Sequence, residues 1–511
     1  MAKVLVTGGA GYVGATVAHW LNDRGHDVTV LDDLSTGHRS FVAPGRKLLL
    51  ARVGSPECRD LLLRERFEAV LHFAAWTLVS ESVKFPERYL ENNVEETRRL
   101  IAYLREAGTG RFVFSSTCAI FGDVGATRIT EELPRAPLSP YGTSKQKVEE
   151  LLESSARTWG LQAIPLRYFN AAGAESKLRV GEWHEPETHL IPNIFKAARA
   201  HQPVSVFGTD YPTPDGTCIR DYIHVSDLAL AHESALNKLL ALPVGEGFFR
   251  PFNLGSEAGY SVREVIAECQ KVLRRDLGRE VVLEEHPRRA GDAPRLVGDS
   301  TRARTELGFK PLHRLDSIVE SAWAWEQKRA LPRPAVLLDR DGTLNVDPGY
   351  IKNAEDLHLL PGAGAALGKL SAAGFPLVII SNQSGVGRGL IPAEAIPLIN
   401  QRVNTLLAPF GAQILRFQLC FHNPDEGCAC RKPGTKLIEE VARDLHLDLA
   451  RSVFIGDRET DLLAGRASGC GTVILVRTGD GKKTEASLKT GECDVVVDDL
   501  SAAADYFLSL A

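Results

Sequence analysis

The sequence has no long apolar run and no marked excess of charge of either sign. Its 511 residues include 60 lysines and arginines against 65 aspartates and glutamates, a net charge of −5. Without a basic surface a nucleic-acid partner is disfavoured. No apolar run approaches the length of a membrane span, and the chain opens on a strand-like Lys-Val-Leu-Val rather than on a secretory signal. We therefore expect a cytoplasmic protein with small-molecule substrates and no membrane partner.

Cysteines are also few, nine in all. An odd number spread thinly through a chain of this length is no disulfide framework and fits a reducing compartment. Three of them gather with a histidine between residues 420 and 430: Cys420, His422, Cys428 and Cys430. Three thiolates and one imidazole suit a closed, tetrahedral zinc site. We predict a structural zinc loop over 420–430, in preference to a coincidental cluster.

Repeats and low-complexity segments are lacking too, and the chain instead alternates β-rich runs with helical stretches. Such alternation predicts βαβ units on parallel sheets, an α/β fold. Pro332 and Pro334 end a helical stretch, and a fresh apolar strand follows. At this length two to four domains are expected. We predict three parts, over residues 1–170, 171–330 and 331–511.

A glycine-rich turn, Thr7 to Gly14, stands between the first strand and the first helix. Glycines here permit a tight turn and the close approach of a pyrophosphate to the helix N-terminus. An acidic residue about 20 residues further on, at the end of the next strand, suits a ribose hydroxyl, and Asp32 meets that pattern. The context favours a dinucleotide site over a glycine turn without a ligand. Residues 1–170 are therefore predicted to form a Rossmann-type NAD-binding domain.

Tyr141 and Lys145 are four residues apart, a spacing that places both on one face of a helix. An ammonium near a phenol lowers the tyrosine pKa, which would make Tyr141 a base near neutral pH. Alone, the pair fits an ordinary surface helix better.

Together these motifs, with Phe114-Ser-Ser-Thr117, Arg167-Tyr-Phe-Asn170 and the stretch Phe207 to Ala229, resemble the extended short-chain dehydrogenase/reductase family. Within it, residues 1 to about 328 look like the UDP-glucose 4-epimerases. The resemblance implies NAD-dependent inversion of C4 of a UDP-hexose, a small substrate domain over 171–330, and a homodimer. A reductase or decarboxylase on the same fold is the alternative, which net NAD reduction or CO2 release would identify.

The resemblance also implies roles for individual residues. Tyr141 takes the proton of the 4-hydroxyl, Thr117 hydrogen-bonds the reacting oxygen, and Lys145 holds the nicotinamide ribose. The implied NAD-binding residues are Gly8, Gly11, Tyr12, Val13, Gly14, Asp32, Asp33, Phe73, Ala74, Ala75, Asn93, Tyr141, Lys145 and Tyr168. The implied substrate-binding residues are Thr117, Asn170, Phe207, Arg220, Arg289 and Asp292.

The sequence departs from this family at several positions. Thr117 stands where many members have serine. Thr77 stands where some members have lysine. Arg52-Val53 replaces a Gly-Asp pair near the adenine, which removes an adenine contact. His189 replaces an asparagine, and Leu296 lies where side-chain size is thought to decide whether N-acetylated sugars fit.

The last part carries a second set of motifs, each at the end of an apolar strand. Asp339-Arg-Asp341 offers a nucleophile and a proton shuttle, and Gly456 to Asp461 offers carboxylates for Mg²⁺. Ser381-Asn382-Gln383 and Lys432 offer a hydroxyl, amides and a cation for phosphate. Taken singly, Asp339-Arg-Asp341 could equally be an acidic loop.

In this order the motifs resemble the haloacid dehalogenase (HAD) phosphatases over residues 335 to 511. The resemblance implies an aspartyl-phosphate on Asp339 and acid–base catalysis by Asp341. It also implies Mg²⁺ on Asp339, Asp341 and Asp457, and a phosphate clamp of Ser381, Asn382, Arg431 and Lys432.

A zinc loop in this superfamily is typical of heptose-bisphosphate and histidinol-phosphate phosphatases. More segments favour D-glycero-D-manno-heptose 1,7-bisphosphate as the substrate. The short spacer in the zinc loop and Gly-Asp-Arg-Glu-Thr-Asp favour histidinol phosphate. An inactive zinc-bound interaction module is the third reading, and the retained site residues argue against it.

Overall fold

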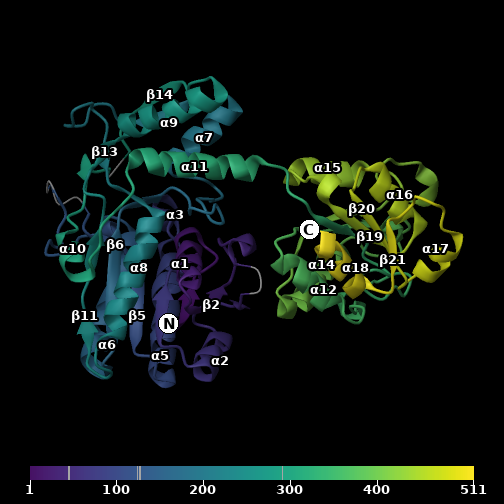
Figure 1. Ribbon diagram of the computed structural model, residues 1–511, viewed down its shortest axis with the longest axis horizontal. Helices are drawn as coiled ribbons and strands as arrows, with labels where there is room; N and C mark the ends of the chain where they lie inside the picture. Colours follow the sequence, from purple (N-terminus) through teal and green to yellow (C-terminus); the bar gives the residue numbers. More distant parts are fainter. Residues whose placement is uncertain (44–45, 123–124, 126–127, 290–291, 511) are drawn as a thin grey trace. The chain divides into compact units, whose positions relative to one another are not determined.

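The chain folds into two compact units, Met1–Lys328 and Arg329–Ala511. The structure is a computed structural model that describes residues 1–511 except 44–45, 123–124, 126–127, 290–291 and 511. Each unit holds a parallel β-sheet with helices packed against it, which confirms the predicted α/β fold class (Figure 1). No helix among the described residues is both long and apolar enough to cross a membrane.

The main sheet of the first unit has eight strands, and their pairings are all parallel. Its order is β11-β6-β5-β4-β1-β2-β3, with β12 also paired to β6. The strands are β1 (Lys3–Thr7), β2 (Asp27–Asp32), β3 (Leu48–Leu50), β4 (Ala69–His72), β5 (Arg111–Thr117), β6 (Gln162–Tyr168), β11 (Phe248–Phe249) and β12 (Phe252–Leu254).

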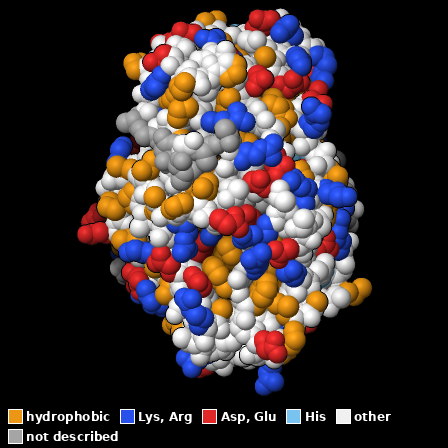
Figure 2. Space-filling view, turned by 90° about the vertical axis from the view of Figure 1, so that its left-hand side faces the viewer, with side chains coloured by type: hydrophobic (Ala, Val, Ile, Leu, Met, Phe, Trp, Pro, Cys, Tyr) orange, Lys and Arg blue, Asp and Glu red, His pale blue; other side chains and the backbone are white. Residues whose placement is uncertain are grey.

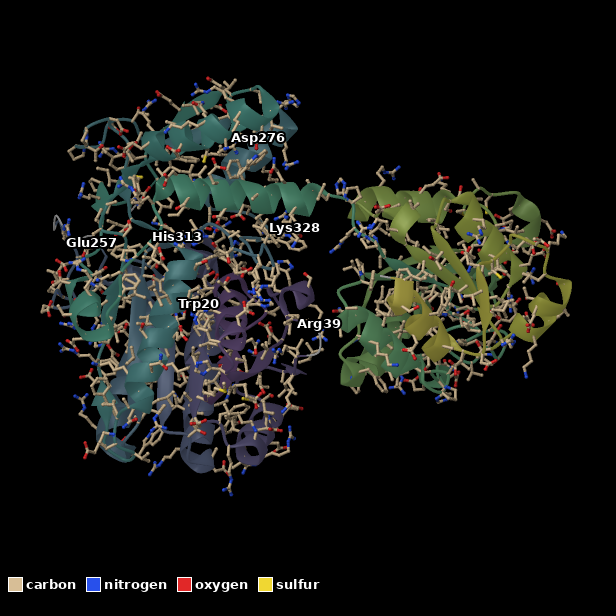
Figure 3. The ribbon with its side chains drawn as sticks, in the orientation of Figure 1. Trp20, Arg39, Glu257, Asp276, His313 and Lys328 are labelled. Atoms are coloured by element: carbon tan, nitrogen blue, oxygen red, sulfur yellow. The ribbon has the colours of Figure 1, made fainter. Side chains whose placement is uncertain are left out.

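Helices cover both faces of this sheet because its buried strands are apolar on both sides. In β1, Val4 and Val6 belong to the core on one face and Leu5 to the core on the other. On the first face lie α1 (Tyr12–Asp23), α8 (Val225–Leu240) and α10 (Thr301–Leu307); on the second lie α2 (Pro56–Glu65), α5 (Glu96–Ala107) and α6 (Pro140–Trp159). The Nε1 of Trp20 on α1 donates to Glu233 of α8 at 2.7 Å (Figure 3 labels Trp20). The sheet is therefore doubly wound.

A smaller region adds helices and short sheets to the same unit. Its helices are α7 (Leu190–Ala200), α9 (Val262–Leu277) and α11 (Leu315–Ala330), whereas α3 (Val79–Lys84), α4 (Pro86–Leu90) and a π-helix (Glu91–Glu95) pack against α5 and α6 beside the main sheet. Its strands pair as β7 (Asn170–Ala172) with β10 (Tyr222–His224), and β8 (Val204–Phe207) with β14 (Leu283–His286). A third sheet joins β9 (Ile219–Arg220) to β13 (Tyr260–Ser261) and β15 (Arg295–Leu296). Asp276 of α9 accepts a hydrogen bond from Trp323 of α11 at 2.7 Å (Figure 3 labels Asp276).

The second unit has a six-stranded parallel sheet of order β18-β17-β16-β19-β20-β21. Val336 and Leu338 of β16 face one core, and Leu337 faces the other. The strands are β16 (Val336–Leu338), β17 (Leu377–Asn382), β18 (Ile414–Cys420), β19 (Val453–Gly456), β20 (Thr472–Val476) and β21 (Val495–Val497). The helices are α12 (Ala363–Ala372), α14 (Ala395–Leu407) and α18 (Leu500–Leu510) on one face, α15 (Lys436–Leu445) and α16 (Glu459–Ala467) on the other, and the short α13 (Ser384–Gly387) and α17 (Gly481–Ser487).

Short 3₁₀ helices complete both units: Arg39–Phe41, Cys118–Ile120, Ala354–Asp356, Ala408–Phe410, Pro424–Glu426 and Leu449–Arg451. Acidic and basic side chains are interspersed over the face in view in Figure 2, as the small net charge leads one to expect.

Candidate functional sites

A cavity of about 1030 Å³ lies at the carboxyl ends of β1, β2, β4 and β5, where ligands bind in open α/β sheets. It brings together most residues predicted for the cofactor and several predicted for the substrate: Gly8, Gly11, Tyr12, Val13, Gly14, Asp32, Asp33, Phe73, Ala74, Ala75, Thr117, Tyr141, Lys145, Tyr168, Asn170 and Arg220. These residues come from widely separated parts of the first unit.

The glycine turn brings the N-terminus of α1 to this cavity. Gly8 has a φ of +69°, which favours glycine, and a Cβ there would collide with the backbone of Ala74. A Cβ on Gly14 would collide with the carbonyl oxygen of Gly8. Asp32 is buried and accepts hydrogen bonds from the backbone N–H of Ala10 at 2.9 Å and of Leu34 at 2.8 Å. The hydrogen bond from Ala10 thus holds the glycine turn against Asp32.

Tyr141 and Lys145 lie in the first two turns of α6, whose N-cap Ser139 accepts from the N–H of Gly142 at 3.1 Å. The Lys145 Nζ donates to the Ser115 carbonyl at 2.8 Å and stands 4.9 Å from the centre of the Phe114 ring. Tyr168 and Ser115 are joined by a hydrogen bond between their hydroxyls. The end of β5 and the start of α6 therefore form one wall of the cavity.

The prediction that the pKa of Tyr141 is lowered is wrong for this structure. Burial raises the tyrosine pKa to about 12, against the opposing effect of a hydrogen bond with Thr117. Burial also lowers the pKa of Lys145 to about 7, with Glu149 opposing. The Lys145 ammonium is not among the causes of the Tyr141 shift, whose direction is set by burial of the phenol.

Four residues predicted for this site are not among the described residues that line the cavity: Asn93, Phe207, Arg289 and Asp292. Asn93, in the π-helix, uses its amide on the backbone of Trp76 at 2.9 and 3.0 Å and on Ser144 at 3.0 Å, so it braces the wall from behind. Asp292 forms an ion pair with Arg220, which does line the cavity. Arg289 stacks on Phe207, its guanidinium carbon 4.0 Å from the ring centre.

The positions that depart from the family pattern all face the cavity: Arg52, Val53, Thr77, His189 and Leu296. Glu182 and His184 also line it, and sequence reasoning missed them. The signal available was the pair of Glu-x-His triplets in Glu182-Trp-His-Glu-Pro-Glu-Thr-His189.

In the second unit, Lys432 is the centre of a buried charge cluster at the carboxyl ends of β16, β17 and β19. Its Nζ is 2.6 Å from an oxygen of Asp339 and 2.6 Å from an oxygen of Asp461, and it donates to the Ile380 carbonyl at 2.7 Å. Asp457 lies at the end of β19, and carboxylate oxygens of Asp339, Asp457 and Asp461 all lie within 4.8 Å of one another. Three buried carboxylates suit a hard divalent cation such as Mg²⁺. The motif Gly456 to Asp461 was offered for Mg²⁺ as a whole, but only its Asp457 was named as a ligand.

These carboxyl groups differ in pKa because their neighbours differ. Burial raises the pKa of Asp339 to about 6, with Lys432 opposing and Asp461 adding to the rise. For Asp457, burial together with Asp339 and Asp461 raises the pKa to about 7. Burial acts the same way on Asp341, but the Arg340 guanidinium and other donors outweigh it and hold its pKa below the ordinary value.

Asp341 is held by three side chains. Arg340 donates twice, at 2.9 and 2.8 Å, Gln383 donates at 2.7 Å, and Asn345 donates at 3.0 Å. Arg340 is 1% exposed, and sequence reasoning gave it no role. The charge-assisted pair fixes Asp341 beside Ser381, whose hydroxyl accepts a hydrogen bond from Gln383 at 3.0 Å.

Asn382 binds the main chain of Lys432 rather than standing free for a ligand. Its amide accepts from the Lys432 N–H at 3.0 Å and donates to the Lys432 carbonyl at 3.2 Å. Arg431 has a buried guanidinium nitrogen with no hydrogen-bond partner in the described part of the chain. An anion is a partner that such a group would accept.

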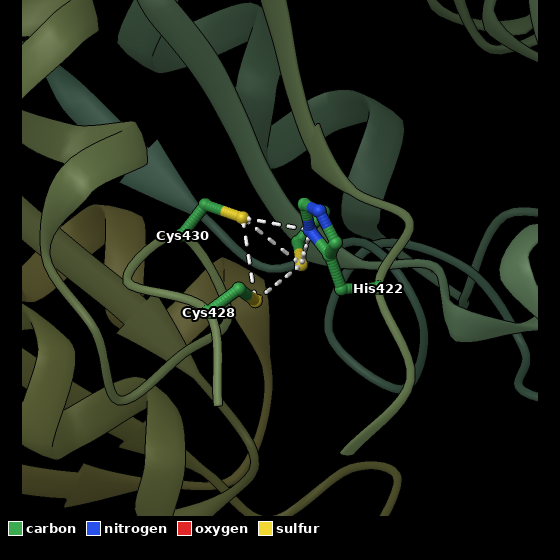
Figure 4. Close-up of side chains that lie close together, drawn as sticks. His422, Cys428 and Cys430 are labelled. Carbon is green, nitrogen blue, oxygen red and sulfur yellow. Dashed lines mark hydrogen bonds between the residues drawn. The ribbon is translucent and has the colours of Figure 1, made fainter. Parts of the chain in front are cut away.

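The predicted zinc ligands meet in a compact cluster (Figure 4). The sulfurs of Cys420, Cys428 and Cys430 are 3.4 to 3.7 Å apart, and the His422 Nδ1 is 3.1 Å from Cys430 and 3.6 Å from Cys420. A tetrahedron with Zn–S bonds of about 2.3 Å has edges of about 3.8 Å. The four side chains therefore fit zinc, and they immediately precede Arg431 and Lys432.

The fold and the first cavity define the N-terminal unit as a dinucleotide-binding enzyme of Rossmann type. The NAD dependent epimerase/dehydratase family model matches residues 4–255. A UDP-glucose 4-epimerase of Corynebacterium glutamicum is 44% identical over 325 residues, 63% of this chain and 95% of that protein. One of Azospirillum brasilense is 44% identical over 328 residues, 64% of this chain and 92% of that protein. The chain belongs to the NAD-dependent epimerase/dehydratase family.

Solved structures of UDP-glucose 4-epimerases are similar to the same part of the chain. A UDP-glucose 4-epimerase of Stenotrophomonas maltophila, with bound NAD and formylated UDP-arabinopyranose, matches with a TM-score of 0.60 at 34% identity, over 64% of this chain and 98% of that one. The Brucella ovis enzyme in complex with NAD matches with a TM-score of 0.59 at 39% identity, over the same shares. A HAD-hydrolase-like family model matches residues 429–503, so the C-terminal unit is HAD-like.

Proposed function

We propose that this chain carries two activities: NAD-dependent C4 epimerisation of UDP-glucose and UDP-galactose, and Mg²⁺-dependent hydrolysis of a phosphate monoester. The observation that carries the first is Tyr141 and Thr117 on the same cavity as the glycine turn and Asp32. The observation that carries the second is Lys432, buried between Asp339 and Asp461.

In the epimerase unit, Tyr141 takes the proton of the sugar 4-hydroxyl, and Thr117 hydrogen-bonds the same oxygen. NAD would be held by the glycine turn and Asp32, and when bound it would supply both the acceptor and the later donor of the C4 hydride. After the flat 4-keto sugar turns over in the cavity, Tyr141 returns the proton to the 4-oxygen as C4 regains its hydride on the other face. The pKa of Tyr141 is about 12 in this structure, so Tyr141 would accept the proton only once the positive charge of bound NAD lowers that pKa.

The test of the epimerase proposal is Tyr141→Phe. The phenyl ring keeps the packing and removes the proton acceptor, so we expect kcat for UDP-galactose epimerisation to fall by about 10² to 10⁴. The melting temperature and phosphate release should stay at their original values. Tyr103→Phe is the matched control, because its hydroxyl donates to the Gly54 carbonyl outside the cavity, at 3.0 Å. Full epimerisation by Tyr141→Phe would refute the assignment.

In the HAD-like unit, Asp339 attacks phosphorus, and Asp341 passes a proton to the leaving oxygen. Because Arg340 and its other donors hold the pKa of Asp341 below the ordinary value, that proton arrives with the phosphate monoanion of the substrate. Lys432 holds one oxygen of Asp339, leaving the other for attack, and Ser381 and Arg431 bind the phosphoryl oxygens. Asp341 then takes a proton from the water that cleaves the aspartyl-phosphate. Asp339, Asp457 and Asp461 would hold Mg²⁺, with the Asp341 carbonyl as a further ligand, and the cation would neutralise developing charge. A zinc ion on the Cys3His set would fix the loop that carries Arg431.

D-glycero-D-manno-heptose 1,7-bisphosphate is the proposed substrate. Asp339-Arg-Asp-Gly-Thr-Leu-Asn, Asn382-Gln-Ser-Gly-Val-Gly and Val476-Arg-Thr-Gly support it, and the partner unit acts on sugars. Histidinol phosphate is the second candidate, favoured by the short spacer between His422 and Cys428.

Phosphate release with Mg²⁺ from each of these two esters distinguishes the candidates. A clear preference for the heptose supports the proposal, and preference for histidinol phosphate replaces it. Asp339→Asn should abolish release from either ester while epimerisation persists, because the amide is no nucleophile. Asp498→Asn is the control, since Asp498 is 84% exposed. Release from neither ester, with epimerisation intact, would favour the inactive zinc-bound module.

A further inference from the structure

A second cluster of metal-ligand side chains lies on the wall of the cavity in the first unit. It consists of Glu182, His184, Glu187 and His189, two Glu-x-His triplets five residues apart in the loop that leads into α7. Each offers one nitrogen or carboxylate oxygen, and these four atoms all lie within 4.8 Å of one another. None of the activities proposed above uses this cluster.

The four groups alternate around a common centre. The Nδ1 of His189 is 2.8 Å from Glu182 and 2.9 Å from Glu187. The Nδ1 of His184 is 3.7 Å from Glu182 and 3.6 Å from Glu187. Four ligands at about 2.0–2.1 Å from a tetrahedral zinc ion stand about 3.4 Å apart. The observed separations bracket that value.

Two features suit a cation at the centre of this cluster, in addition to the hydrogen bond between the His189 ring and Glu187. The side chains of Glu182 and Glu187 are only 6% and 8% exposed, and among the described residues no lysine or arginine forms an ion pair with either. The Nδ1 of His184 is buried and makes no hydrogen bond of ordinary length within the described part of the chain. Buried carboxylates require a compensating charge, and an unsatisfied ring nitrogen requires a partner.

We propose that Glu182, His184, Glu187 and His189 bind one divalent transition-metal ion, best matched by zinc. Two imidazoles and two carboxylates are a zinc-type donor set, and the ion balances both carboxylates while giving His184 a partner. With all four positions taken by protein, the ion is structural. Because Glu182, His184 and His189 line the cavity, the ion fixes this part of its wall.

The experiment counts zinc by mass spectrometry in the full-length protein after loading with Zn²⁺ and removal of excess metal. We expect two zinc ions per chain in the original protein, one in His184→Gln, one in Glu187→Gln and one in Cys430→Ser. The double variant His184→Gln/Cys430→Ser should hold none. His286→Gln, a partly exposed histidine 3.8 Å from Glu284, should keep two.

A second measurement keeps the test independent of folding defects. In Cys430→Ser, Co²⁺ should give d–d absorption bands without thiolate charge transfer, and Zn²⁺ should raise the melting temperature. Zinc that is lost in Cys430→Ser but unchanged in His184→Gln and Glu187→Gln would overturn the proposal, leaving protonated imidazoles as the counter-charges. One zinc per chain that is lost only in His184→Gln would support this site and exclude zinc from the cysteine loop.

Discussion

At the scale of single residues, burial sets the protonation behaviour of the polar groups in the first unit. His72 is fully buried between the Thr7 hydroxyl at 2.6 Å and the Thr97 hydroxyl at 2.9 Å, and burial lowers its pKa to about 3. Burial likewise lowers the pKa of His224 to about 3 and that of His232 to about 4. All three rings are therefore neutral in the folded protein at neutral pH and protonate on unfolding in acid.

We predict that His72→Gln flattens the acid dependence of stability. The folded-state pKa is below the ordinary value near 6.5, so between those two values the unfolded chain binds one more proton at this site. The stability contributed by neutral His72 is full above pH 6.5 and is lost as the pH falls towards about 3. Glutamine does not titrate, so the slope of the unfolding free energy should decrease by up to about 1.4 kcal/mol per pH unit in that window.

Denaturant unfolding at a series of pH values measures this slope. Glutamine can keep one of the two hydrogen bonds to threonine, and any uniform loss of stability shifts the whole curve without changing its slope. His286→Gln, at a partly exposed ring, serves as the control. An unchanged slope in His72→Gln would mean that the ring protonates without unfolding.

At the scale of elements, the turn from β1 to α1 depends on backbone contact rather than on side chains. Gly14 on α1 touches the Gly8 carbonyl, and Gly8 lies against the backbone of Ala74, which follows β4. Three segments therefore meet with no room for a Cβ, and their meeting point is one wall of the cavity. The glycine spacing predicted the strand–turn–helix pattern. It did not predict that the backbone at Ala74 packs against the turn.

We predict that Gly14→Ala destabilises the first unit by roughly 1–3 kcal/mol, because the new methyl group forces α1 away from the turn. Bound NAD should be lost from the purified protein for the same reason. Gly110→Ala is the matched control, since a Cβ there meets nothing within 4 Å and it should be neutral. Thermal unfolding and the cofactor content of the two variants provide the comparison. Equal NAD content in the two variants would show that the glycine turn does not contribute to NAD binding.

At the scale of the whole molecule, the chain is two units joined near Lys328, each with its own sheet and core. Leu331, next to the junction, is 65% exposed. The proposed substrates, a UDP-hexose and a phosphorylated heptose or histidinol, are different molecules, so we expect no shared intermediate to pass between the sites.

We predict that residues 1–328 and 329–511, made separately, each keep the activity of their half. Each half retains a complete sheet with helices on both faces, so each can fold alone. Steady-state rates of epimerisation and phosphate release should match those of the full chain within about twofold. Faster combined flux in the joined chain than in an equimolar mixture would instead show coupling between the sites.

The sequence by itself determined the local features. Apolar runs specify the strands β1, β2, β4, β5, β6, β16, β17, β19 and β20. Motif spacing identified the glycine turn, Asp339 and Lys432. Both kinds of feature were predictable because strands and turns depend on nearby residues. The edge strands β3 and β21 were not predicted, because these three-residue strands, unlike β16, are not followed by a site motif that marks where the strand ends. Only the tertiary structure decided the strand order, the meeting of Lys432 with Asp461, the place of Asn93 behind the cavity wall, and the cluster around His184. Those depend on packing between distant segments, as does the desolvation that moves Tyr141 and Lys145 away from their ordinary pKa values.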